Sequence, residues 1–139
     1  MKKIIVLSFI ILFSNYSFSQ SQSARYKELR GLLISEGYSI STEQYADLKQ
    51  GGTAGYTKTF YEGTSYVIVA ISDDSDVSDV DVYLRYTDGT EYSKDTDSES
   101  LAILKFNPTY TREMRVVIKN YASRTPNYAS RCRFIIAYK

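Results

Sequence analysis

The sequence lacks histidine and tryptophan altogether and has one cysteine among its 139 residues. Without histidine, the chain cannot form Ser-His-Asp or Cys-His nucleophilic sites or use imidazole as a general acid or base. With one cysteine and no histidine, we also expect no zinc site, because zinc in proteins is mostly bound by several nitrogen or sulfur ligands. Paired carboxylates can hydrolyse glycosidic bonds, but the sequence singles out no such pair among its acidic residues. We therefore expect a protein that is not an enzyme.

The lone cysteine also excludes a disulfide within the chain, so the fold has to rest on its hydrophobic core. Cys132 lies between Arg131 and Arg133 in a segment that alternates like a β-strand. Neighbouring residues of a strand point to opposite faces, so we expect the two arginines to lower the pKa of the thiol only slightly. We expect a buried and unreactive thiol; an intermolecular disulfide is the alternative.

Residues 1–20 have the pattern of a secretory signal peptide. Two lysines follow the first methionine, residues 4–13 are apolar apart from Ser8, and small residues follow. The apolar run is shorter than the about 20 residues that a membrane-spanning helix needs. The ending Phe18-Ser19-Gln20 resembles that of export signals in Bacteroidota. We expect a mature chain that is periplasmic or secreted and has no membrane span; for this segment, a buried N-terminal strand is the alternative.

The mature chain expected in this way is close to neutral. Removing Lys2 and Lys3 from the 17 basic residues leaves 15, against 16 acidic ones. Nucleic-acid binding needs a clear positive excess, so we expect no nucleic-acid partner. The charges are unevenly spread, because residues 73–99 hold ten acidic and two basic residues, whereas residues 100–139 hold eight basic and one acidic residue.

One helix is predicted before the rest of the domain. Four apolar residues follow the helical period between residues 23 and 36: Tyr26, Leu29, Leu32 and Leu33. Gly37 stands where a helix commonly ends in a left-handed residue. We expect the helix to pack on the domain that follows; docking on a partner is the alternative. The expected division is a signal peptide at 1–20, a helical segment at 21–38 and a β-sandwich domain at 39–139.

After residue 38, short segments rich in Thr, Tyr, Val and Ile alternate with turn residues, which is typical of an all-β sandwich or barrel. Residues 66–72 are apolar on both faces, so they predict a central strand that is covered on both sides. Residues 80–86 alternate and predict a strand whose polar face, with Asp79 and Asp81, is wet. Asp88-Gly89 predicts a type I′ turn. We expect seven or eight strands, and the candidate segments are residues 44–49, 56–61, 66–72, 80–86, 91–94, 101–106, 112–121 and 130–139.

Several short motifs between residues 44 and 121 resemble those of the bacterial pre-peptidase C-terminal domain. They are Tyr56-Thr57-Lys58-Thr59-Phe60, Glu62-Gly63-Thr64-Ser65-Tyr66, Asp79-Val80-Asp81-Val82-Tyr83-Leu84, Asp88-Gly89-Thr90, Asp95-Thr96-Asp97 and Arg115-Val116-Val117-Ile118. The resemblance implies a jelly-roll-like β-sandwich, and we expect it to be antiparallel. Members of this family are usually appended to exported peptidases, and some bind calcium or polymeric substrates. Here we expect the domain to stand alone in an exported protein, with a helix in front of it.

Acidic residues after the central strand are the best candidates for a metal site. Calcium takes six to eight oxygen ligands, mostly carboxylates and carbonyls of loops, and we expect no other cofactor. The spacing is not that of an EF-hand. The alternative is a solvated acidic loop that is neutralised by Arg85, Lys94 or the C-terminal arginines. The candidate calcium ligands are Asp73, Asp74, Asp76, Asp79 and Asp81, joined by Asp95 and Asp97 from the end of the neighbouring hairpin.

The 14 tyrosines are many for this length. Most are expected on strands, where tyrosine is favoured; an exposed stacking surface of Tyr56, Tyr61, Tyr83 and Tyr121 is the alternative. The sequence as a whole favours a monomeric, non-catalytic binding or accessory module with an unidentified protein or polysaccharide partner. The second hypothesis is a structural or interaction protein of the cell envelope that docks through its helix or an edge strand.

Overall fold

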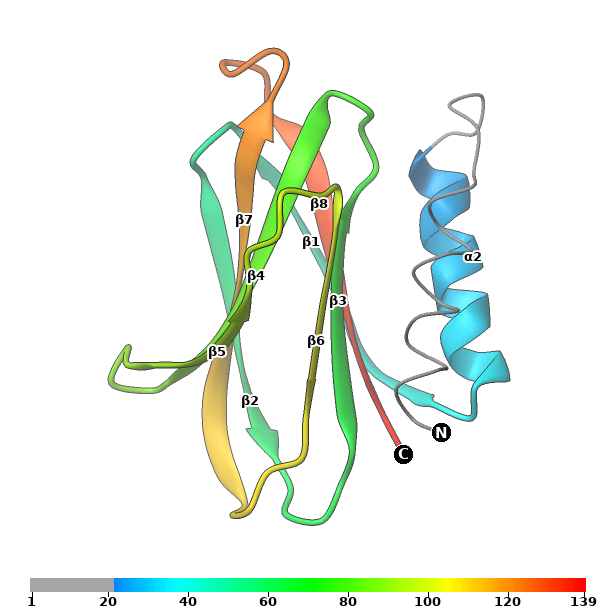
Figure 1. Ribbon diagram of the computed structural model, residues 1–139, viewed down its shortest axis with the longest axis vertical. Helices are drawn as coiled ribbons and strands as arrows, with labels where there is room; N and C mark the ends of the chain where they lie inside the picture. Colours follow the sequence, from blue (N-terminus) through cyan, green and yellow to red (C-terminus); the bar gives the residue numbers. More distant parts are fainter. Residues whose placement is uncertain (1–21) are drawn as a thin grey trace.

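The described part of the chain forms two β-sheets packed face to face, with one helix beside them (Figure 1). This computed structural model describes residues 22–139, so the predicted signal peptide lies outside the described residues. No helix within residues 22–139 is long and apolar enough to cross a membrane. The elements are α2 (Gln22–Ser35), β1 (Ser39–Leu48), β2 (Thr53–Phe60), β3 (Tyr66–Ser72), β4 (Val77–Tyr86), β5 (Glu91–Asp95), β6 (Leu101–Phe106), β7 (Arg112–Ser123) and β8 (Ser130–Tyr138).

The strands pair in a nested series, all antiparallel: β1 with β8, β2 with β7, β3 with β6, and β4 with β5. The pairs are distributed over sheet A, in the order β1-β8-β3-β6, and sheet B, in the order β2-β7-β4-β5. Two four-stranded sheets built from nested pairs are the arrangement of a jelly roll. The expected jelly-roll-like sandwich is confirmed, and its number of strands is eight.

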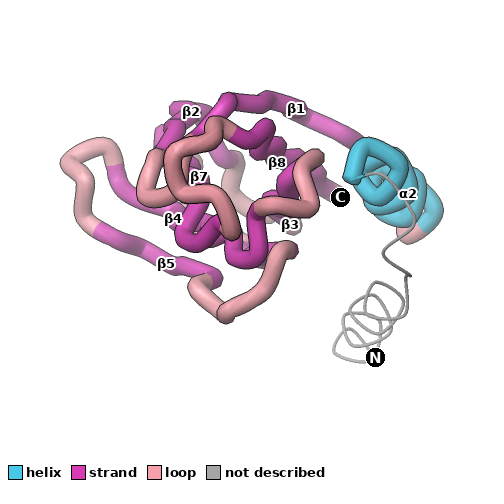
Figure 2. Tube along the Cα trace, turned by 90° about the horizontal axis from the view of Figure 1, so that it is seen from above, coloured by secondary structure: helices cyan, strands magenta, loops and turns pink. Residues whose placement is uncertain are grey.

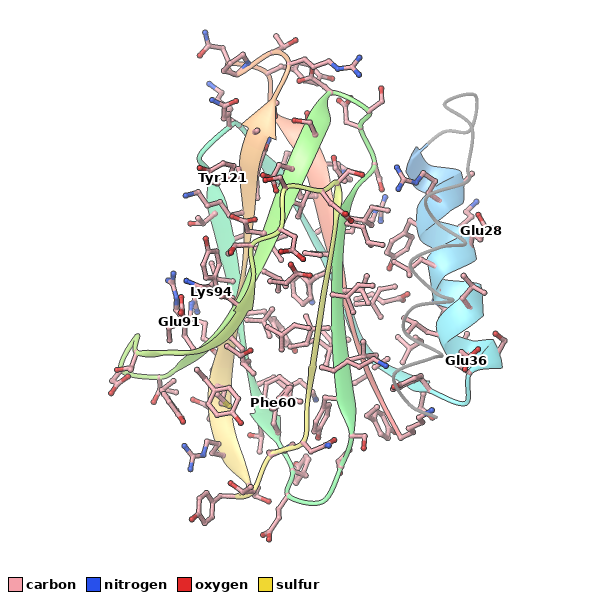
Figure 3. The ribbon with its side chains drawn as sticks, viewed as in Figure 1. Glu28, Glu36, Phe60, Glu91, Lys94 and Tyr121 are labelled. Carbon is pink, nitrogen blue, oxygen red and sulfur yellow. The ribbon has the colours of Figure 1, made fainter. Side chains whose placement is uncertain are left out.

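The main hydrophobic core lies between the two sheets. Phe60 is fully buried there and meets the rings of Tyr66 and Phe106 edge-on, with centroids 4.9 and 5.0 Å away (Figure 3). Cys132 is fully buried in the same core, on the face of β8 that also holds Phe134. Burial raises the pKa of the Cys132 thiol to about 11. The expectation of a buried thiol is therefore confirmed.

A second apolar cluster lies on the outer face of sheet A, where α2 packs against β3 and β8 (Figure 2). Leu29 and Leu33 are 0% and 2% exposed and belong to one buried cluster with Val67, Val69 and Ile135. This contact explains why β3 is apolar on both faces, since one face lies in the sandwich core and the other lies under the helix. The predicted packing of the helix on the β-domain is confirmed.

The helix ends as the sequence predicts. Gly37 has a φ of +88°. Its N–H donates to the carbonyl of Ile34 at 3.0 Å, and the N–H of Tyr38 donates to the carbonyl of Leu33 at 3.0 Å. These two bonds are those of a Schellman motif, in which a left-handed glycine lets the chain turn back sharply. The turn leads directly into β1, which starts at Ser39, earlier than expected.

The turn between β4 and β5 differs from the predicted type I′ turn. That turn needs positive φ at both central residues, but among residues 22–139 only glycines have positive φ, and here this is Gly89. The N–H of Gly89 donates to the carbonyl of Tyr86, and the N–H of Tyr86 donates to the carbonyl of Thr90. The loop therefore has three residues and ends in a left-handed glycine. The Asp88 carboxylate accepts the N–H of Thr90 at 2.8 Å, a local bond that favours this conformation.

Candidate functional site

The seven carboxylates predicted as calcium ligands lie in three different environments. Asp73 accepts hydrogen bonds from Arg133, with the guanidinium Nη2 2.7 Å from its Oδ2. The two side chains are 16% and 26% exposed, so the pair is largely shielded from solvent. The Asp73 carboxylate raises the pKa of the Arg133 guanidinium. At this position, an arginine of the C-terminal strand neutralises the acidic segment, as the alternative interpretation expected.

Asp74 and Asp76 hold the loop between β3 and β4 in place. Asp74 accepts the N–H of Asp76 at 2.9 Å and the hydroxyl of Ser130 at 3.3 Å. Asp76 accepts both the N–H and the hydroxyl of Thr125, each at 3.1 Å. These bonds tie the loop after β3 to the β7–β8 loop and to the start of β8. The carboxylates of Asp74 and Asp76 thus have structural partners within the protein.

Asp79 and Asp81 form a buried pair on β4, and the expectation that this face of the strand is wet is wrong for them. They are 7% and 2% exposed. Strand β5 pairs with β4 only from Val82 onward, and the loop that follows β5 covers the earlier part, where the N–H of Val80 donates to the carbonyl of Glu99 at 2.9 Å. The loop therefore excludes water from two carboxylates that a sheet edge alone would leave exposed.

Burial determines the titration of the pair. It raises the pKa of Asp79 to about 6, and the negative charges of Asp81, Asp95 and Asp97 add to this effect. Burial also raises the pKa of Asp81, although the hydroxyl of Tyr83 opposes the shift by donating to Asp81 Oδ2 at 3.3 Å. The carboxyl groups are close enough to hydrogen bond when Asp79 carries a proton. Below about pH 6, one proton shared by the two neighbouring acids therefore neutralises part of their charge.

Asp95 is the last residue of β5, and Asp97 lies in the covering loop that follows it. Asp95 accepts the N–H of Asp97 at 3.2 Å and the N–H of Ile103 at 2.8 Å. These bonds fix the loop between β5 and β6, and the charges of both residues act on Asp79. Among residues 22–139, no three His, Cys, Asp or Glu side chains come together in an arrangement that holds a metal. The structure thus brings Asp79 and Asp81 together, with Asp95 and Asp97 nearby, and places Asp73, Asp74 and Asp76 in other contacts.

The outer face of sheet B lies on the side of the sandwich opposite α2, which packs on the outer face of sheet A. Figure 3 shows Tyr121, Lys94 and Glu91 on the side of the sandwich away from α2. The strand register places the outward residues in rows across this face. The rows are Thr53, Lys119 and Asp81; then Gly55, Val117, Tyr83 and Lys94; then Thr57, Arg115, Arg85 and Glu91.

Cations and tyrosines are interleaved on this face. The guanidinium of Arg85 lies 4.9 Å from the ring centroid of Tyr83, and the ammonium of Lys119 lies 5.3 Å from that of Tyr121. Arg115 extends across Gly55, where an added Cβ would collide with the guanidinium, and it donates to the Thr57 hydroxyl at 3.2 Å. The glycine therefore provides the space that lets this arginine lie flat on the sheet.

Three of these cations make no ion pair within 4 Å in the described part of the chain, although the charge of Lys119 acts on Asp81. The ion pairs found within residues 22–139 join Arg30 to Glu43, Lys94 to Glu91, Arg131 to Asp47 and Arg133 to Asp73. Arg85, Arg115 and Lys119 take part in none of them. These three cations were not among the residues predicted to form a site, although the alternation of Arg115 and Lys119 with the apolar residues of β7 was a signal for them.

The four tyrosines considered as a stacking surface do not form one. Tyr56 is partly buried and packs against the core, with its ring centroid 6.0 Å from that of Phe134. Tyr61 is exposed, but it follows Phe60, the last residue of β2, which pairs with Arg112 at the start of β7. Tyr121 lies near the other end of β7. Tyr83 and Tyr121 both lie on the outer face of sheet B. Two of the four tyrosines thus lie on the outer face of sheet B, beside Arg85 and Lys119.

Comparisons with known proteins support the fold. No protein-family model matches the sequence, and no curated protein matches it. Among solved structures, the chain is similar to the pre-peptidase C-terminal domain of a collagenase from Bacillus anthracis, with a TM-score of 0.52 and 13% identity over 70% of this chain and 89% of that one. It is also similar to PliG from Aeromonas hydrophila, a periplasmic inhibitor of g-type lysozyme, with a TM-score of 0.51 and 6% identity over 72% and 87%. At these identities the similarity shows a shared β-sandwich fold, as the resemblance to the pre-peptidase C-terminal domain implied.

Proposed function

We propose that this protein is an exported, non-catalytic binding module that holds an acidic polysaccharide on the outer face of sheet B. The observation that supports it best is the contrast between the two sheets. Helix α2 packs on the outer face of sheet A, whereas the outer face of sheet B carries Arg85, Arg115 and Lys119 without ion-pair partners in residues 22–139. Cations left unpaired on a sheet face are available to an anionic ligand.

The chemistry of the face suits carboxylate groups on an extended polymer. Guanidinium groups bind carboxylates with two parallel hydrogen bonds, and the rings of Tyr83 and Tyr121 offer apolar surfaces beside the cations. Arg115 and Lys119 are four residues apart on one strand, which corresponds to about 13 Å. A linear polymer with repeated acidic groups can reach both cations at once, whereas a small anion reaches one.

Binding to immobilised polymers tests this function. The protein should be retarded in gels that contain polygalacturonate and should migrate freely through neutral dextran, with retardation that weakens as salt is added. Arg115→Ala and Lys119→Ala should each weaken binding. Arg124→Ala and Lys27→Ala remove the same charges from exposed positions off this face and should leave binding unchanged. Equal losses in all four variants would show that net charge alone is responsible and would contradict the assignment.

Export is part of the proposal and has its own experiment. The full chain and a variant without residues 2–20 are expressed with an epitope tag at the C-terminus, and the cells are fractionated. We expect the full chain in the periplasm or the medium in a shortened form, and the variant in the cytoplasm. Full-length protein in the cytoplasm would contradict export.

A protein partner is the second candidate. Its support is the fold shared with PliG, whose function is to inhibit a lysozyme. Docking through the apolar side of α2 is disfavoured, because Leu29 and Leu33 are already buried against sheet A. The edge strands, such as β1 and β6 of sheet A, remain as docking sites for a strand of a partner. Capture of one defined envelope protein, together with no retardation by any acidic polymer, would favour this candidate.

A further inference from the structure

Four aromatic side chains gather around Arg112 at the start of β7. The guanidinium carbon of Arg112 lies 5.1 Å from the ring centroid of Tyr86 and 5.2 Å from that of Tyr110. The ring of Tyr92 meets that of Tyr86 edge-on, with centroids 5.6 Å apart, and lies 6.1 Å from that of Phe106. The hairpin of β4 and β5, which carries Tyr86 and Tyr92, projects from the side of the sandwich (Figure 1). These five residues are called the Arg112 cluster.

The Arg112 cluster is separate from the outer face of sheet B. Alternate residues of a strand share one face, so Arg112 lies on the same side of β7 as Met114, which is buried in the core between the sheets. Arg115 is three positions away from Arg112 and points to the other side. Tyr86 also packs against the core between the sheets. The cluster thus continues this core outward at one end of the sandwich.

The positive charge of Arg112 is not neutralised by another side chain of the described residues. Within residues 22–139, the Arg112 side chain takes part in no ion pair and no side-chain hydrogen bond. The nearby rings attract its charge, but they do not use up the N–H donors of the guanidinium. The side chain is half-buried, so a ligand can reach it, while water screens its charge less than at a fully exposed position.

We propose that the Arg112 cluster binds a small aromatic carboxylate. The guanidinium of Arg112 would donate two parallel hydrogen bonds to the carboxylate, whose planar shape matches it. The ring of the ligand would pack on Tyr110 and Tyr92, which are 64% and 45% exposed. Aromatic rings favour edge-on or offset contacts with one another, and Tyr92 already meets Tyr86 in this way.

The composition of the cluster favours an aromatic acid over other anions. It contains a single cation, which suits a ligand with a single negative charge. A sugar acid has the same charge, but its hydroxyl groups need several polar partners, whereas the cluster consists of four rings and one guanidinium. This inference does not rest on the proposed polysaccharide binding, because Arg115 and Lys119 are not part of the cluster.

Titration of the protein with phenylacetate, followed by backbone NMR, tests the site. We expect saturable chemical-shift changes with a Kd in the millimolar range, as is usual for a ligand of this size. The largest changes should occur at the amides of Tyr92, Tyr110 and Arg112. Acetate has the charge without the ring, and phenylacetamide has the ring without the charge. Each should bind at least about fivefold more weakly than phenylacetate, and so should galacturonate.

Substitutions assign the binding to the cluster. Arg112→Gln should weaken phenylacetate binding by about tenfold or more. Its matched control is Arg124→Gln, the same change at an exposed position of the β7–β8 loop, which should leave the Kd unchanged. Tyr110→Ala should weaken binding by about threefold to tenfold, whereas Tyr110→Phe, which keeps the ring, should not. The control for Tyr110→Ala is Tyr128→Ala, at another exposed tyrosine.

The Tm of each variant is measured first, so that a loss of binding is not confused with unfolding. Because Tyr110 is exposed, Tyr110→Ala keeps the proposal testable even if Arg112→Gln does not fold. N-acetylphenylalanine distinguishes two sources of the ligand: tighter binding than phenylacetate assigns the C-terminus of a peptide, and weaker binding assigns a free acid. The proposal is overturned if phenylacetate causes no saturable change, or if acetate, phenylacetamide or galacturonate binds as tightly. It is also overturned if Tyr110→Ala and a folded Arg112→Gln variant both keep the wild-type Kd.

Discussion

Asp79→Asn is expected to stabilise the protein near neutral pH in the absence of divalent cations. Burial and the neighbouring acids raise the pKa of Asp79 from 3.8 to about 6. When the pKa of an acidic group is higher in the folded protein than in the unfolded chain, the folded protein loses stability as the pH rises from the lower to the higher value. The reason is that the unfolded chain releases the proton more easily. Above pH 6 the full penalty is present, and below pH 4 it is absent. Asparagine has the same shape and no charge, so it avoids the penalty.

The size of the effect follows from the pKa. The rise is about two pH units, and one unit corresponds to about 1.4 kcal/mol, so the gain is at most about 3 kcal/mol. The amide introduced by Asp79→Asn would also offer an N–H donor to the unpaired Oδ1 of Asp81. The free energy of unfolding is measured by urea denaturation at pH 7.5 and at pH 4 with chelator present. We expect Asp79→Asn to exceed wild type by about 2–3 kcal/mol at pH 7.5 and by much less at pH 4.

The control for charge is Glu113→Gln, at an exposed position of β7, which should differ little from wild type at either pH. A result in which Asp79→Asn destabilises the protein equally at both pH values would refute the reasoning. It would mean that Asp79 is a satisfied hydrogen-bonding group rather than a buried charge at neutral pH.

Three further predictions concern the helix, the thiol and the ion pair on sheet A. Leu29→Ala, at a fully buried position of α2, should lower the free energy of unfolding by about 2–5 kcal/mol, whereas Lys27→Ala, at an exposed position of the same helix, should not. Equal effects of the two changes would contradict the packing of the helix on the sheet. Cys132, with its pKa raised to about 11, should not react with a thiol reagent at pH 8 until urea unfolds the protein, and rapid labelling of the folded protein would contradict its burial. Asp73→Asn should cost about 1–3 kcal/mol, because it leaves the shielded Arg133 without its charged partner. The exposed pair is the matched comparison: Asp47→Asn should cost less, and a larger loss there would contradict the argument.

Patterns confined to single segments predicted most of the fold. The central strand followed from an apolar run in residues 66–72, and the structure explains it by the two clusters that cover Val67 and Ile68 from opposite sides. The helix and its glycine end followed from the spacing of Leu29, Leu33 and Gly37. Each of these patterns depends on neighbours in the sequence, which are visible without knowledge of the tertiary structure.

The candidate site depended on contacts between distant segments and was predicted less well. Alternation placed Asp79 and Asp81 on a wet face, but a loop further along the chain covers them, as the bond from Val80 to Glu99 shows. The grouping of cations on the outer face of sheet B depends on the strand register that places Arg85 opposite Arg115. No pattern within one segment of the sequence contains this register. The prediction of a type I′ turn was wrong because the bond from the Thr90 N–H to the Asp88 carboxylate competes with the general preference of the dipeptide.

Backbone NMR during titration with polygalacturonate fragments tests the central claim, that the outer face of sheet B is the binding surface. We predict chemical-shift changes that saturate and are confined to β4, β7 and the adjoining part of β2, with the largest at residues next to Arg115 and Lys119. Amides of α2 and β1, on the opposite side of the sandwich, should not change. Changes centred on α2 or β1, or no saturable change at low salt, would contradict the account.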